Sequence, residues 1–170
     1  VEVAQQAMPE AELKILTGQD EGPLTLNALT NWLREGFDIL YLVCHGATRK
    51  DDSRLFLEDE EGGVKLVMGE EIVKRIQMLP RQPRLVVLAS HQTTPIAIQF
   101  AEAGIPAILA TLEHITIDTM QHYSYEFFKE LMREGRADRA ASWARAAVIE
   151  RPDWWSPVLY TRVKDGKIWR

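Results

Sequence analysis

The run Asp38-Ile-Leu-Tyr-Leu-Val-Cys-His-Gly46 places a continuous apolar segment directly before a cysteine, a histidine and a glycine. A second apolar run, Leu85-Val-Val-Leu-Ala89, leads in a similar way into Ser90, His91 and Gln92. Segments that are apolar at every position are typical of strands buried on both faces, and such strands belong to parallel sheets. The two runs therefore predict strands of a buried parallel sheet.

Further strands and helices are expected on both sides of these runs. Ala107–Ala110 is a third apolar run, and Glu12–Leu16 is a more exposed strand candidate. Helical patterns cover residues 24–34, 95–103, 117–134 and 138–149. Gly36, Gly104 and Gly135 follow three of them at positions where a glycine commonly ends a helix. Strands that alternate with helices of this length predict a doubly wound α/β sheet.

One segment interrupts this alternation. Arg54–Glu58 and Val64–Val67 flank an acidic, glycine-containing turn, and the pattern predicts a β-hairpin. Near the C-terminus, Asp165-Gly166 lies between Val163 and Ile168 and repeats the hairpin signal.

Composition limits the class of protein. The chain has 170 residues, of which 46% are hydrophobic and 26% charged, which predicts one globular domain with a substantial core. Twenty Lys and Arg residues stand against 25 Asp and Glu residues, a formal net charge of -5. A nucleic-acid binder normally presents a basic face, so we expect no nucleic-acid partner.

The single cysteine, Cys44, excludes an internal disulfide and a multi-cysteine zinc site, and it suits a reducing cytoplasm. No stretch approaches the roughly 18 apolar residues of a membrane span, and no signal peptide opens the chain. We therefore expect a cytoplasmic location and no membrane partner. Because the sequence begins with Val1, we interpret it as a piece of a longer protein.

Two of the four histidines follow the apolar runs. His45 comes after the first run and His91 after the second. Ligands of open α/β sheets bind beyond the carboxyl ends of the strands. If the two strands are neighbours, both imidazoles overhang one cleft.

The residues around both histidines are similar to one family. Asp38–Gly46 resembles the histidine motif of CHAT domains, caspase-like peptidase domains that are often fused to helical repeats. Arg84–Thr93 resembles the nucleophile motif of that family, in which a strand leads into two small residues, Cys, Gln, Thr and Gly. Other segments resemble later family elements in the same order, namely the hairpin 55–67, the helix 70–77, Gly104–Thr111, Asp118, the helix 138–149 and Trp154-Trp155. The resemblance covers roughly residues 10 to 162.

This resemblance implies a caspase-like three-layer α/β sandwich, with a mostly parallel central sheet flanked by helices and a β-hairpin insertion. Family peptidases use a Cys–His dyad, in which a thiolate attacks the scissile carbonyl. Matched motif by motif, the dyad histidine is His45 and the nucleophile position is His91. Gly46, Glu113 and Asp118 fall on positions that the resemblance assigns to the substrate pocket.

Three positions depart from the family pattern. His91 stands where cysteine is expected, Thr94 replaces the closing glycine, and Glu113 replaces a common tryptophan. Imidazole is a poor nucleophile towards a peptide bond, and its acyl adduct is labile. We therefore predict a catalytically inactive pseudopeptidase, without metal or cofactor, that acts in binding or regulation. Its expected partners are a protein or peptide and upstream domains of the same chain, such as helical repeats.

Neighbouring residues do not supply another nucleophile. Cys44 precedes His45, and Ser90 precedes His91, and successive strand residues point to opposite faces. We interpret Cys44 as a core residue. His114 and His122 are given surface or hydrogen-bonding roles.

Other readings stay open. His45 and His91 could coordinate a metal with Glu113 or Asp118 as a third ligand, although the spacing lacks a short metal signature. Alternatively, the chain is a cysteine endopeptidase whose nucleophile at position 91 has been replaced. A third reading is a generic α/β binding module, favoured if the strands before His45 and His91 are not adjacent.

Overall fold

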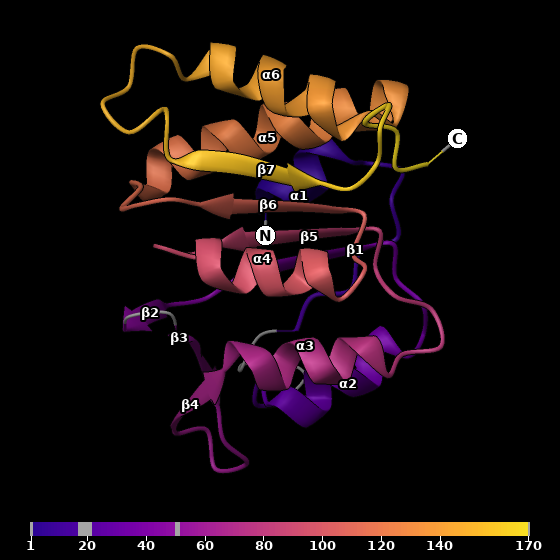
Figure 1. The fold of residues 1–170 in the computed structure, drawn as a ribbon, viewed down its shortest axis with the longest axis vertical. Helices are drawn as coiled ribbons and strands as arrows, with labels where there is room; N and C mark the ends of the chain where they lie inside the picture. The colour runs from indigo at the N-terminus through magenta and orange to yellow at the C-terminus, as the bar shows by residue number, and fades with distance from the viewer. Residues whose placement is uncertain (1, 17–21, 50–51, 170) are drawn as a thin grey trace.

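The computed structural model describes residues 2–16, 22–49 and 52–169. Its central sheet has four strands in the order β1-β5-β6-β7 (Figure 1). The first three run parallel, and the last pairs antiparallel with β6. The expected mostly parallel sheet is therefore confirmed. The strands are β1 (Ile39–Val43), β5 (Leu85–Ala89), β6 (Ala107–Thr111) and β7 (Pro157–Thr161).

Helices cover the sheet on both faces and complete three layers (Figure 1). One core joins the sheet to three helices, α2 (Leu26–Leu33), α3 (Gly69–Gln77) and α4 (Thr94–Glu102). The opposite core joins it to α1 (Glu2–Ala7), α5 (Ile117–Glu134) and α6 (Ala137–Ala147). This arrangement is the predicted α/β sandwich.

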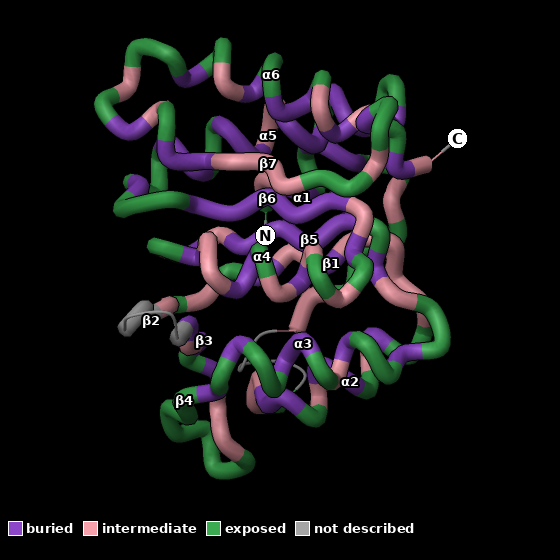
Figure 2. The backbone as a smooth tube through the Cα atoms, in the orientation of Figure 1, coloured by how far each residue is buried: buried purple, intermediate pink, exposed green. Residues whose placement is uncertain are grey.

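The two cores explain why the strand sequences are apolar throughout. Val86 and Leu88 belong to the core of α2, α3 and α4, while Leu85 and Val87 belong to the opposite core. Alternate residues of a strand point to opposite faces, so both sets must be apolar. At the sheet edge the prediction of complete burial is wrong, because β1 has a partner strand on one side only and Val43 stays 56% exposed. Figure 2 shows the contrast between the buried middle strands and the outer segments.

The predicted hairpin forms beside this sheet and gains a strand. β3 (Asp52–Glu58) and β4 (Val64–Met68) pair antiparallel, as expected. The Asp59 carboxylate accepts hydrogen bonds from the backbone N–H of Glu61 and Gly63 and fixes the turn. The third strand, β2 (Gly46–Arg49), pairs with β3 and was not predicted.

Local capping sets the helix boundaries. α5 spans the predicted residues, because the Thr116 hydroxyl accepts from the Thr119 N–H at its start and Gly135 ends it with a left-handed φ of 66°. α2 begins later than predicted, since the Thr25 hydroxyl accepts from the Ala28 N–H.

Two strand predictions were wrong. Residues 12–16 form no strand, because Lys14 pairs with Glu35 and lies over the rings of Trp32 and Phe37, which holds this segment against the end of α2. The expected C-terminal hairpin does not close either.

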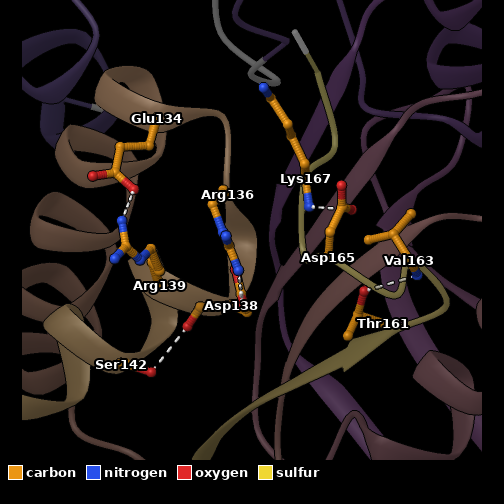
Figure 3. A network of polar contacts seen from close by, with 9 residues as sticks. All are labelled: Glu134, Arg136, Asp138, Arg139, Ser142, Thr161, Val163, Asp165 and Lys167. Carbon is orange, nitrogen blue, oxygen red and sulfur yellow. Dashed lines mark hydrogen bonds and ion pairs between the residues drawn. The ribbon is translucent and has the colours of Figure 1, made fainter.

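At the C-terminus, the backbone of Lys167 forms an isolated antiparallel β-bridge with Arg136, the residue before α6. The Gly166 carbonyl oxygen accepts a hydrogen bond from the Ala137 N–H. Figure 3 shows the polar network that surrounds this contact, with Asp165 accepting from the Lys167 N–H. The segment therefore pairs with the α5–α6 connection instead of with itself. Within the described ranges, no helix is long and apolar enough to cross a membrane.

Candidate functional site

Parallel pairing brings His45 and His91 to the same end of adjacent strands. β1 and β5 are in register, with Val43 opposite Ala89, and each histidine follows its strand by two residues. The strands before His45 and His91 are therefore adjacent, which removes the condition that favoured a generic α/β binding module. His45 is exposed, whereas His91 is only partly exposed.

The His91 ring is held from two sides. It stacks on His114, with ring centroids 4.2 Å apart and an angle of 14° between the planes. The backbone N–H of Ile115 donates to its Nδ1 over 3.3 Å. Burial, followed by the nearby His114 and His45, lowers the pKa of His91 below its ordinary value. The ring is therefore held neutral at neutral pH.

This hydrogen bond determines what the His91 ring can do. A neutral imidazole that accepts at Nδ1 carries its proton on Nε2. While this hydrogen bond is present, neither nitrogen offers a free lone pair for attack, and a proton can be added only at Nδ1, in place of the Ile115 hydrogen bond. His91 is thus a poor nucleophile for a second reason, in addition to the chemistry of imidazole itself.

The loop that carries His91 is anchored to β6 through Thr111. The buried Thr111 hydroxyl donates to the Ser90 carbonyl, and the Thr111 N–H donates to the Thr93 hydroxyl over 3.0 Å. In return, the Thr93 N–H donates to the Thr111 carbonyl over 3.0 Å. Gln92, at the tip, has a φ of 53°, a left-handed conformation that is uncommon outside glycine. The loop therefore follows a strained path with firm attachments.

Gly46 lets the two strand ends approach closely. A Cβ at this position would lie 2.7 Å from the Ser90 hydroxyl and 3.2 Å from the His91 carbonyl oxygen. Ser90 is 6% exposed, and among the described residues its hydroxyl has no hydrogen-bond partner. Without a base beside it, Ser90 is a packing residue in this arrangement, as its position in the strand pattern suggested.

Cys44 is also a packing residue. It packs against the core on the α2 and α3 side, and burial raises the pKa of its thiol to about 12. A thiol with this pKa is almost fully protonated at neutral pH and is not a nucleophile. The next residue, His45, is exposed.

The two predicted acidic pocket residues have different surroundings. Glu113 follows β6 and accepts from the Gln92 side-chain amide over 3.0 Å, which places it beside the His91 loop. Asp118 lies on α5 and pairs with Arg151, and hydrogen bonding to Arg151 lowers the pKa of its carboxyl. The described contacts of Asp118 are with Arg151 and His122, not with the two motif histidines.

The described residues around the motif histidines do not form a set of metal ligands. Within residues 2–16, 22–49 and 52–169, no group of three or more His, Cys, Asp or Glu side chains could hold a metal ion. The pairing of Asp118 with Arg151 explains why one of the two candidate third ligands is directed elsewhere.

Sequence reasoning missed the part that His114 plays in this site. His114 follows β6, which pairs with β5 on the side opposite β1, so its ring reaches the same end of the sheet. The signal was present in the sequence, because a third apolar run also ends just before a histidine. His114 was placed near the predicted cleft but was given only a surface or hydrogen-bonding role, because the family motifs point to His45 and His91.

Fold and site together define a three-layer α/β domain with a histidine-lined sheet end at the position where open sheets bind ligands. A family model for the CHAT domain matches residues 1–162. The chain belongs to the CHAT family. No curated protein matches the sequence at a significant level.

Proposed function

We propose that this CHAT domain is a caspase-like pseudopeptidase that binds a peptide or protein segment without cleaving it. The observation that carries the proposal is the side chain at position 91, an imidazole whose Nδ1 is occupied by the Ile115 N–H. Peptide-bond cleavage by a Cys–His dyad needs a thiolate at that position. The only thiol of the chain, on Cys44, is partly buried, and its raised pKa keeps it protonated.

Exposed apolar side chains next to the histidines support binding. Leu112, which follows β6, is 40% exposed, Ile117 at the start of α5 is 78% exposed, and Trp155 is 43% exposed. The Leu112 N–H donates to the Ser156 carbonyl, so the Trp155 segment lies against the end of β6. Apolar side chains gathered beside polar groups are typical of interaction surfaces. We infer that an extended segment of the bound partner lies across the histidines and across these exposed apolar side chains, which we call the apolar rim.

The remaining parts of the proposal concern partners. We propose that the domain holds or regulates a protein partner through the histidines and the exposed apolar side chains beside them. Upstream domains of the same chain, such as the helical repeats found in relatives of this family, would then deliver or present that partner in the cytoplasm.

A retention experiment tests binding. The chain is mixed with a capped random decapeptide library, and retained peptides are weighed by mass spectrometry after gel filtration. We expect the native chain and the His122→Ala variant to retain intact peptides, because the described contacts of His122 on α5 are with Asp118 and Arg151 and not with the motif histidines. The double variant His45→Ala, His91→Ala should retain far fewer. Equal retention by all three proteins, or none by any, contradicts the proposal.

A further inference from the structure

Three imidazoles gather at the carboxyl ends of the parallel strands. His45 follows β1, His91 follows β5, and His114 follows β6. The His91 and His114 rings are stacked, and the charge of His45 acts on His91 strongly enough to help lower its pKa. His45 and His114 are exposed, so an incoming group can reach the cluster.

The His91 ring offers a donor to that group. Because its Nδ1 accepts from the Ile115 N–H, its Nε2 carries a proton and can only donate. A proton added to the ring goes to Nδ1 and displaces the Ile115 hydrogen bond, and Nε2 remains a donor on a ring that is now charged. In both states the complementary ligand atom is therefore a hydrogen-bond acceptor, and in the charged state it is an anion.

The acidic groups around the cluster already have donors of their own. Glu113 accepts from the Gln92 amide, and Asp118 pairs with Arg151. Asp153 accepts from the Thr116 N–H and the Thr119 hydroxyl. In the described contacts, only Asp118 of these three carboxylates is paired with a cation. The causes that shift the pKa of His91 are burial and two histidines and include no carboxylate, so an external anion would meet a charged His91 ring without a bound counterion.

We propose that His45, His91 and His114 form a recognition site for a carboxylate side chain of the bound segment, and that this site binds more tightly as the pH falls. The inference rests on the proposed peptide-binding function and adds the chemistry of the partner, an aspartate or glutamate in an extended segment. The apolar rim at Leu112 and Ile117 would hold the flanking residues.

The pH dependence has a definite sign. In the free protein the pKa of His91 is lowered by burial and by the two neighbouring histidines. A bound carboxylate favours the charged ring and raises that pKa, so binding takes up a proton. Affinity is constant above the pKa of the complex, rises as the pH falls towards the pKa of the free protein, and levels off below it.

Three capped, fluorescent nonapeptide pools test the site. They share random flanking positions and carry a fixed central Glu, Gln or Lys, and binding is followed by fluorescence anisotropy at about pH 5.5 and about pH 7.5. We expect the Glu pool to bind about tenfold more tightly than the Gln pool at the lower pH, within the usual range of coupled binding. This preference should shrink at the higher pH.

Variants of the native chain locate the effect. His91→Ala and, independently, the exposed His114→Ala should remove the preference for Glu and its pH dependence. His122→Ala, which exchanges an exposed histidine paired with Asp118, should keep both. An unchanged preference in His91→Ala and His114→Ala overturns the assignment.

The remaining outcomes separate the inference from the function on which it rests. If the three pools bind equally, peptide binding stands and the carboxylate site fails. If no pool binds at either pH, both fail. If free glutarate competes as strongly as the Glu pool itself, the site takes small carboxylates, and the assignment of a peptide side chain is overturned.

Discussion

We expect Thr111→Val to lower the free energy of unfolding by about 2 kcal/mol, the usual cost of leaving a buried polar group without its partner. Thr111 is fully buried, and its hydroxyl donates to the Ser90 carbonyl at the base of the loop that carries His91. Valine has nearly the same shape, so the change removes the hydrogen bond without creating a cavity. Urea unfolding of the two proteins measures the difference.

Thr161→Val is the matched control. Thr161 is exposed, and its hydroxyl donates to the Pro106 carbonyl and accepts from the Val163 N–H on the outer strand. Water can replace both contacts there, so we expect a loss below about 0.5 kcal/mol. Equal losses in the two variants would show that the Thr111 hydroxyl does not anchor the His91 loop.

Gly166→Ala has the larger expected effect, a loss of about 2–4 kcal/mol. Gly166 is buried with a left-handed φ of 68°, which costs an alanine energy. A Cβ there would also lie against the Asp138 carboxylate, well inside the 3.0 Å that real Cβ contacts respect. The carboxylate would have to move away from Arg136, whose Nη2 donates to it over 2.8 Å (Figure 3). Thermal and urea unfolding measure the loss.

Gly62→Ala separates backbone strain from this collision. Gly62 has a φ of 80°, and nothing lies within 4 Å of the position that a Cβ would take. Strain alone should cost about 1 kcal/mol at this position. If Gly166→Ala costs no more than Gly62→Ala, the packing of the C-terminal segment on Asp138 contributes nothing to stability.

Elements with strong local signals were predictable from the sequence. α5 was predicted to the residue, because its apolar side chains share one face and Gly135 marks its end. The apolar runs Leu85–Ala89 and Ala107–Ala110 were recognised as β5 and most of β6, since strands buried on both faces are apolar at nearly every position. In these elements the pattern of apolar residues alone indicates which faces are buried.

Elements that depend on distant partners were not predictable. β7 begins with Pro157 and is only half buried, and its strand form depends on pairing with β6. The segment 12–16 has a strand pattern, but the contacts of Lys14 with Glu35 and Trp32 hold it elsewhere. The local sequence of a segment does not indicate which distant segment it will pack against or pair with.

The site divides in the same way. The sequence placed His45 and His91 after two strands of a parallel sheet, and the structure shows that these strands are neighbours. The stacking of His114 on His91 and the Ile115 hydrogen bond come from the loop after β6, whose path no motif specifies. Those two contacts explain why His91 presents a donor, which the sequence alone did not indicate.

The most direct test of the account is a search for cleavage by the native chain. A capped peptide library is incubated with the native protein and with His45→Ala, and new amino termini are labelled and identified by mass spectrometry. We predict that no terminus appears with the native protein that is missing with the variant. Termini that depend on His45 would contradict the account, because they would show that the site cleaves peptides without a thiol at position 91.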